Sequence, residues 1–228
     1  MNIEEKIKDC EFFLKQINHF NPDPYYVDYF FKAYLQSVID VYDEIFTEAN
    51  RDFGLFISGK CTPEKFERKA TEKSDHLALR FLSWFKENYE KEHTSPYSNF
   101  ITKISGFFKE GNHLPKITIK IRANQRYQED ISQSIQVGLT DGKIRSKEEL
   151  QIEIKRQTPV FLEIINQKRK INNEPKVSEN QILASTYLDM NNFEDIEISH
   201  ACEIYLPVLR RFLDESRNEI RKLTSWAS

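Results

Sequence analysis

Two glutamate–histidine pairs in the sequence have a spacing that metal sites use. The pairs are Glu90–His93 and Glu197–His200. Residues three positions apart lie on one face of an α-helix, so each pair would direct a carboxylate and an imidazole toward one ion. Carboxylate-bridged di-iron bundles carry such pairs on two helices and add a glutamate from each of two others. The acidic residues that could complete the set are Asp40, Glu44, Glu48, Glu153 and Glu163. A metal-dependent enzyme with a di-metal cofactor is therefore one alternative, and a chance occurrence of both pairs without any cofactor is the other.

The stretch FKENYEKEH raises a second chemistry, because it places Asn88 and His93 five residues apart near the end of an expected helix. Here the chain resembles the HEPN superfamily of helical-bundle proteins, in which a helix carries Arg followed by His, often as Arg-Asn-x-x-x-His. The resemblance implies a homodimer, because in active members the Arg and His of two protomers face each other and cleave RNA. Asn88 stands where the Arg would be and cannot offset phosphate charge. We therefore expect a degenerate nuclease motif that does not cleave RNA; alternatively, both residues only satisfy a helix end.

A basic segment in the middle of the chain suggests an anionic partner. Residues 116–176 hold 13 Lys and Arg against 8 Asp and Glu, a net charge of +5, while residues 1–115 and 177–228 each have a net charge of −4. The segment begins with four cations and no acid: Lys116, Lys120, Arg122 and Arg126. On an extended strand, the first three would share one face and could contact nucleic-acid phosphates. The alternative is that the basic segment packs near the acidic flanks or is simply solvated.

The remaining composition excludes several classes of protein. No phosphate-binding glycine loop, G-x-S-x-G or H-E-x-x-H motif occurs, and the chain has only 6 glycines in 228 residues. Its 3 cysteines form no C-x-x-C pair, and the N-terminus lacks the apolar core of a secretory leader, so we expect reduced thiols and a cytoplasmic location. No apolar run is long enough to cross a membrane.

Hydrophobic periodicity predicts a mainly α-helical protein with a small β-hairpin. The expected helices cover residues 2–20, 24–50, 62–93, 98–109, 146–171, 178–190 and 193–226, with Pro159 kinking or interrupting the fifth. Alternating apolar residues predict two antiparallel strands over 116–122 and 134–139. A glutamine or glutamate three residues after Ser146 and after Ser178 is the pattern that begins a helix.

These elements predict one compact helical bundle with an insertion. Residues 1–112 would form the bundle, 113–145 the hairpin, and 146–228 the C-terminal helices that pack on the bundle. The functional prediction is a non-catalytic interaction or nucleic-acid-associated protein, HEPN-like with a degenerate nuclease motif. The alternatives are the metal-dependent enzyme and a structural protein with no small-molecule site.

Overall fold

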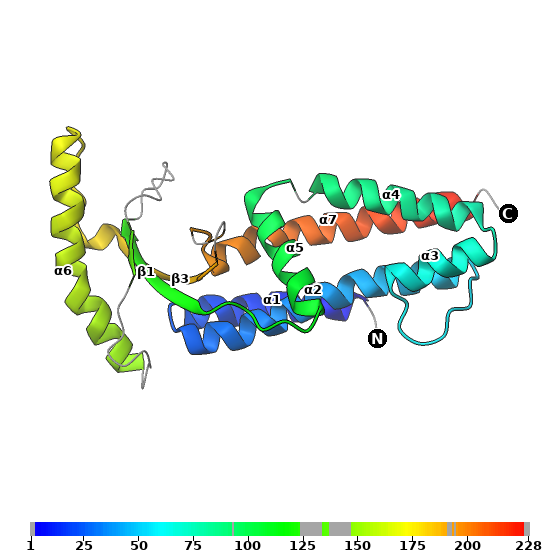
Figure 1. The fold of residues 1–228 in the computed structure, drawn as a ribbon, viewed down its shortest axis with the longest axis horizontal. Coiled ribbons are helices and arrows are strands. Elements are labelled where there is room, and N and C mark those ends of the chain that lie inside the picture. The colour runs from blue at the N-terminus through cyan, green and yellow to red at the C-terminus, as the bar shows by residue number, and fades with distance from the viewer. Residues whose placement is uncertain are drawn as a thin grey trace. The chain divides into compact units, whose positions relative to one another are not determined.

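The computed structural model describes residues 3–92, 94–123, 134–136, 147–190, 193 and 195–225. It confirms a mainly α-helical protein with a small antiparallel β-hairpin (Figure 1). The helices are α1 (Ile3–Phe20), α2 (Pro24–Asp52), α3 (Pro63–Glu72), α4 (His76–Glu92), α5 (Pro96–Lys109), α6 (Lys147–Ile171), the 3₁₀ turn η2 (Glu179–Gln181) and α7 (Ile198–Ser225). The strands are β1 (Ile117–Ala123), β2 (Ser134–Gln136) and β3 (Ile182–Leu188). No helix in the described part of the chain is both long and apolar enough to cross a membrane.

The chain divides into two compact units. The first comprises Met1–Lys15, Phe31–Leu114 and His200–Ser228, and the second comprises Gln16–Phe30 and Pro115–Ser199. The first unit is helical, whereas the second holds the sheet and α6. The boundaries expected at residues 112 and 145 thus separate α6 from the hairpin, although both belong to the second unit.

Aromatic side chains fill the core of the first unit. Phe46 of α2 contacts Phe66 of α3 and Phe85 of α4, with ring centroids 5.3 and 4.7 Å apart. Phe212 of α7 packs edge-on against Phe85 at 5.1 Å and is stacked with Trp84 at 6.1 Å. Large rings bury more apolar area than other side chains, so this cluster accounts for much of the stability of the bundle.

An arginine of α7 connects three helices on the surface of the same unit. Arg217 donates two hydrogen bonds, of 2.9 and 2.8 Å, to the carboxylate of Glu48 on α2 and a third to Glu4 on α1. The hydrogen bonds with Glu48, together with Glu4, raise the pKa of Arg217 despite partial burial. A paired guanidinium and carboxylate fix orientation as well as distance, so this contact sets the register of α7 against α2.

The second unit is a three-stranded antiparallel sheet with α6 packed on it. The strand order is β2-β1-β3, and β1 pairs along its whole length with β3, from Ile117 opposite Leu188 to Ala123 opposite Ile182. The core between sheet and helix consists of buried apolar residues: Ile119, Ile121, Leu150, Phe161, Ile165 and Val177. A two-stranded hairpin is marginal in water, so the third strand and α6 supply the burial that it lacks.

The single helix expected over residues 62–93 is wrong, because the chain forms α3 and α4 with a break between them. Ser74 adopts a left-handed conformation (φ 53°), and the Asp75 N–H donates to the carbonyl of Ala70, which ends α3. The Asp75 carboxylate then accepts hydrogen bonds from the N–H groups of Leu77 and Ala78 and begins α4. The sequence gives no glycine signal for this break, because serine occupies the left-handed position.

The helix expected over residues 178–190 is also wrong. The Ser178 N–H does donate to the Gln181 side chain at 2.9 Å, so the cap exists, but only the turn η2 follows it. The segment then extends as β3, whose sequence ILASTYL contains β-branched and aromatic residues that favour a strand. Pairing along β1 supplies backbone hydrogen bonds that an isolated helix of this length would have to match alone.

Two smaller expectations about helices 6 and 7 need correction. α6 continues through Pro159 as one helix, so the proline does not interrupt it. α7 begins at Ile198 and not at residue 193, because Glu197 still pairs with Tyr187 in an antiparallel bridge and the Ile196 N–H bonds to the Phe193 carbonyl in a turn.

Candidate functional site

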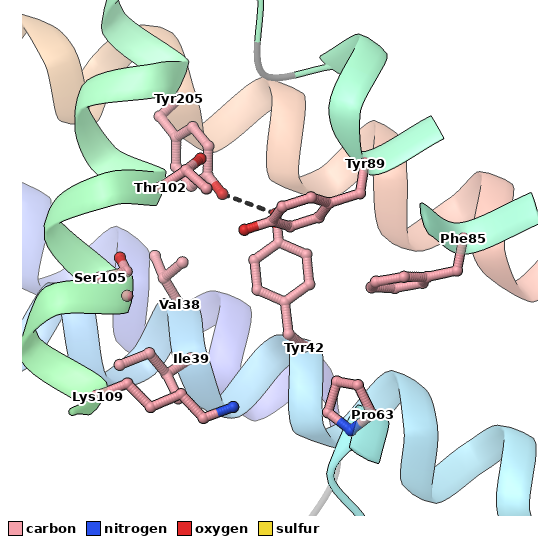
Figure 2. A pocket seen from close by; sticks show the side chains of 11 residues that line it. Val38, Ile39, Tyr42, Pro63, Phe85, Tyr89, Thr102, Ser105, Lys109 and Tyr205 are labelled. Atoms are coloured by element: carbon pink, nitrogen blue, oxygen red, sulfur yellow. Dashed lines mark hydrogen bonds between the residues drawn. The ribbon is translucent and has the colours of Figure 1, made fainter. Parts of the chain in front are cut away.

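A pocket of about 220 Å³ lies within the helices of the first unit (Figure 2). Its walls come from α2, α4, α5 and α7, with Pro63 of α3 at one side. Val38 and Ile39 of α2 and Phe85 of α4 give it an apolar surface. The helices hold these side chains in place through the aromatic core around Phe46, so the pocket is preformed rather than created by a loop.

A group of hydroxyls forms one end of this pocket. The hydroxyls of Tyr42 and Tyr205 are 2.7 Å apart and hydrogen-bonded, and Figure 2 shows those of Tyr89 and Thr102 nearby. Burial raises the pKa of Tyr89 to about 12, partly offset by its hydrogen bond with Thr102. Burial likewise raises the pKa values of Tyr42 and Tyr205 far above that of a free phenol. These phenols are therefore neutral at physiological pH and offer hydrogen bonds, not charge.

One face of α5 supplies the other polar groups. Ser105 and Lys109 are separated by one helical turn and both line the pocket, with Gly106 beside them. Ser105 is 7% exposed, and its Oγ has no hydrogen-bond partner among the described residues. Gly106 is exposed, and an ideal Cβ built on it would meet no atom within 4 Å, so a side chain at this position would enter open space at the edge of the pocket.

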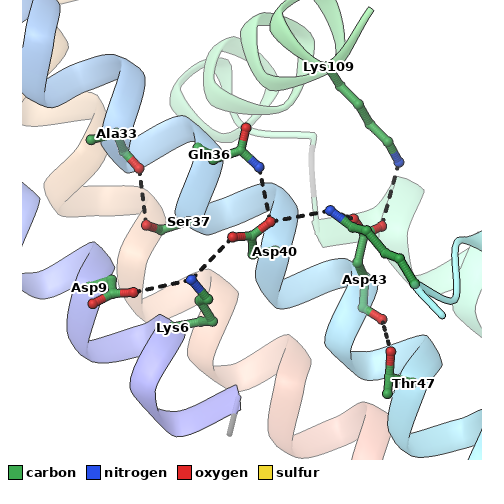
Figure 3. A network of polar contacts seen from close by, with 10 residues as sticks. Lys6, Asp9, Ala33, Gln36, Ser37, Asp40, Asp43, Thr47 and Lys109 are labelled. Atoms are coloured by element: carbon green, nitrogen blue, oxygen red, sulfur yellow. Dashed lines mark hydrogen bonds and ion pairs between the residues drawn. The ribbon is translucent and has the colours of Figure 1, made fainter. Parts of the chain in front are cut away.

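A buried carboxylate lies next to Lys109. The Asp43 side chain is 4% exposed, and its oxygens lie 2.7 Å from Lys60 Nζ and 3.7 Å from Lys109 Nζ. Figure 3 shows Lys109 directed toward Asp43. Its neighbour on α2, Asp40, pairs with Lys6 at 3.2 Å. A buried carboxylate is costly unless it is paired, and here two cations offset it.

The residues of the expected metal site are mostly engaged elsewhere. Glu197 forms an ion pair with Arg122 of β1 at 2.7 Å, and the His200 ring packs edge-on against Tyr97. Glu90 is exposed on α4, and His93 lies outside the described residues. Within the described ranges, no group of three or more His, Cys, Asp or Glu side chains could hold a metal ion.

Of the carboxylates that could complete such a site, three form ion pairs with other residues, and Glu163 accepts a hydrogen bond from Gln167. Asp40 pairs with Lys6, Glu48 with Arg217 and Glu153 with Arg156. A di-metal site would have to break these contacts and neutralise the charges in another way. The di-metal expectation therefore finds no geometric support in the part of the chain that the structure describes.

The nuclease-like pair is described only in part. The Asn88 side chain donates a 2.8 Å hydrogen bond to the Trp84 carbonyl of its own helix, while His93 is outside the described residues. α4 ends at Glu92, so the expected helix end within FKENYEKEH is confirmed. This hydrogen bond holds the Asn88 amide group against its own helix.

The basic strand face is neutralised within the second unit. Arg122 pairs with Glu197 at 2.7 Å and Lys120 with Asp195 at 3.5 Å, and both cations lie over the Tyr187 ring. Their acidic partners come from the flank 177–228, so this part of the basic segment packs against an acidic flank, as the alternative interpretation held. Lys116 is exposed, and Arg126 lies outside the described residues.

The pocket residues belong to no sequence motif and were not predicted. Tyr42 and Tyr205 are 163 positions apart, so their hydrogen bond depends on the tertiary fold. A local signal did exist on α5, where Thr102, Ser105 and Lys109 recur at steps of three and four with Gly106 among them. Polar residues on one face, beside a glycine in a helix, indicate a position where something other than a neighbouring helix is packed.

Comparisons with known proteins add no further information about this site. No family model matches the chain, and neither a curated protein nor a solved structure does. The site must therefore be interpreted from its own geometry.

Proposed function

We propose that this protein is a non-catalytic binding module that holds a small, mainly apolar molecule in the pocket between α2, α4, α5 and α7. The observation that carries the proposal is the pocket itself: about 220 Å³, lined by apolar and aromatic side chains, with a few hydrogen-bonding groups. Pockets of this composition are the usual form of a small-molecule site. An engineered cavity of about 150 Å³ already holds benzene, so a molecule of roughly 8–12 non-hydrogen atoms suits the volume.

The chemistry of the lining favours binding over catalysis. Among the described lining residues there is no His, Cys, Asp or Glu, and the phenols stay neutral. The thiols offer no nucleophile either: all three cysteines are free and buried. Burial raises the pKa of Cys10 to about 12 and that of Cys61 to about 11, and raises the pKa of Cys202 well above its ordinary value. An acid–base reaction near pH 7 needs a group that exchanges protons there.

A neutral probe tests this proposal directly. Ligand-observed NMR with 3-phenylpropanamide should show saturable binding, with a dissociation constant of about 0.1–1 mM for a ligand of this size. Gly106→Leu should abolish binding by filling the open position, while Gly106→Ala adds one methyl group and should retain it. Binding that is unaffected by Gly106→Leu, or no binding at all to the wild-type protein, would contradict the proposal.

Several expectations from the sequence stay part of this proposal. A homodimer is tested by size-exclusion chromatography with light scattering. Of the four cations expected to bind nucleic acid, Lys116 is exposed, so binding by the segment 116–176 would depend on it together with other exposed cations such as Lys168 and Lys170. Such binding predicts an affinity that falls steeply as the salt concentration rises.

The free thiols support a cytoplasmic location. RNA cleavage that is lost in His93→Ala would restore the nuclease interpretation, which we do not expect.

A further inference from the structure

The polar groups of the pocket differ between its two ends. Tyr42, Tyr89, Thr102 and Tyr205 gather at one end and are neutral, whereas Figure 2 shows the Lys109 ammonium at the opposite end. Apolar walls separate these ends. A ligand that uses the whole pocket would therefore have an apolar body and a negative group beside Lys109.

Ser105 supplies a second donor on the same face of α5. Other hydroxyls within helices bond back to the carbonyl four residues earlier, as Thr102 does to Ser98 at 2.7 Å and Ser37 to Ala33 at 3.0 Å. The Ser105 hydroxyl makes no such bond and has no partner among the described residues, and its oxygen is closed off from the pocket in this rotamer, so it meets a ligand only after rotation about χ1. A buried hydroxyl without a hydrogen-bond partner destabilises the protein. A ligand that accepts its hydrogen bond removes this cost and binds more tightly.

Lys109 can contact a ligand without leaving a buried charge unpaired. Asp43 lies 2.7 Å from Lys60 but 3.7 Å from Lys109, so Lys60 is its closer cation. If Lys109 turns toward a ligand, Lys60 still offsets the Asp43 charge. Breaking a buried pair is strongly destabilising only when one partner is left alone.

We propose that the physiological ligand is a small carboxylic acid with an apolar body, whose carboxylate accepts hydrogen bonds from Ser105 Oγ and Lys109 Nζ. Its body would lie against Val38, Ile39 and Tyr42, toward the hydroxyl end. A monoanion fits one lysine and one hydroxyl, whereas a phosphate dianion would leave uncompensated charge beside apolar walls. This inference rests on the proposed function and specifies the ligand class of the same pocket.

An isosteric pair of probes isolates the charge. 3-Phenylpropanoate and 3-phenylpropanamide have nearly the same shape and differ in the negative charge of the carboxylate. In the wild-type protein the acid should bind about tenfold more tightly than the amide, because hydrogen bonds to a charged group are stronger than neutral ones. The preference should fall as salt concentration rises, since Lys109 is partly exposed.

Four variants locate that preference. Lys109→Met should reduce the acid-to-amide ratio to about one while the affinity for the amide stays unchanged. Lys103→Met is the matched control, since Lys103 is exposed on α5, does not line the pocket and changes the net charge equally. Ser105→Ala should weaken the binding of the acid by a few-fold and the binding of the amide by less. Circular dichroism confirms that each variant is folded, and Lys109→Gln provides a second test of the charge.

The outcomes separate the two proposals. Equal binding of acid and amide to the wild-type protein overturns the carboxylate inference and leaves the apolar pocket as a site. A tenfold preference that survives both Lys109→Met and Lys109→Gln also overturns it, because the charge would then be recognised elsewhere. Failure of both probes to bind overturns the proposed function itself.

Discussion

In the first unit, Ser105 is buried without a hydrogen-bond partner among the described residues, and Lys109 shares Asp43 with a closer lysine. In the second unit, Arg122 and Lys120 each have an acidic partner from the segment before α7. Two of the four cations that stand out in the sequence, Lys120 and Arg122, are thus used to hold the sheet. Residues that belong to no motif line the pocket. Whether a polar side chain can bind a ligand depends on the partners that the fold provides for it, and not on its residue type.

The largest expected effect tests whether the two units are separately stabilised. Phe161→Ala removes the central ring between α6 and the sheet and should destabilise the second unit by about 3–5 kcal/mol. Hydrogen exchange should lose protection in β1, β3 and α6, while α4 retains its protection. Equal loss of protection in α4 would show that the units unfold as one.

Alkaline pH should destabilise the first unit through its buried thiols. Burial raises the pKa of Cys10 from 9.0 to about 12, so above pH 9 the folded state keeps a proton that the unfolded state releases. This stabilisation is complete below pH 9 and is lost as the pH rises toward 12, at about 1.4 kcal/mol per pH unit. Urea unfolding between pH 8 and 11 measures it.

Removing the thiol provides the control for that experiment. Cys10→Ala should make the free energy of unfolding fall less steeply above pH 9, by one proton's contribution. For Cys61→Ala, the difference in the free energy of unfolding between variant and wild type should stop changing at a lower pH, because burial raises the pKa of Cys61 only to about 11. An identical pH dependence in Cys10→Ala and wild type would show that the thiol does not titrate as proposed.

The neutralised strand face predicts a moderate loss of stability. Arg122→Ala leaves Glu197, whose side chain is 15% exposed, without its cation and should cost about 1–2 kcal/mol after allowance for the partial exposure of the arginine. Lys116→Ala removes the same charge from an exposed position next to β1 and should change stability by less than about 0.5 kcal/mol. Equal effects of both variants in urea unfolding would mean that the ion pair contributes nothing.

The smallest expected effect concerns the glycine of α5. Gly106→Ala should stabilise the protein by about 0.5–1 kcal/mol, because alanine favours a helix and its Cβ would meet no atom within 4 Å. Gly111→Ala is the counterpart: at φ 82° a side chain is strained, so this variant should lose stability. Thermal unfolding compares the two, and a destabilised Gly106→Ala would show that the position is not open.

The sequence predicted correctly those helices and strands that are determined by neighbouring residues, such as a helix cap or an alternation of apolar side chains. The cap and proline at Thr62–Pro63 begin α3, and the alternation of Ile117, Ile119 and Ile121 marks β1. The prediction failed where long-range pairing decides, as in β3, which continues from a capped turn into a strand because β1 is beside it. The pocket was missed for the same reason, since its hydroxyls come together only when α2 and α7 are packed.

Chemical-shift mapping tests the central claim, that the pocket of the first unit is a binding site. When 3-phenylpropanoate is titrated into isotope-labelled protein, the amides of Thr102, Ser105, Gly106 and Lys109 should shift in a saturable manner, because this face of α5 lines the pocket. The amides of β1 and β3 should not shift, and Gly106→Leu should remove the response. Shifts confined to the sheet, or a response that persists in Gly106→Leu, would contradict the account.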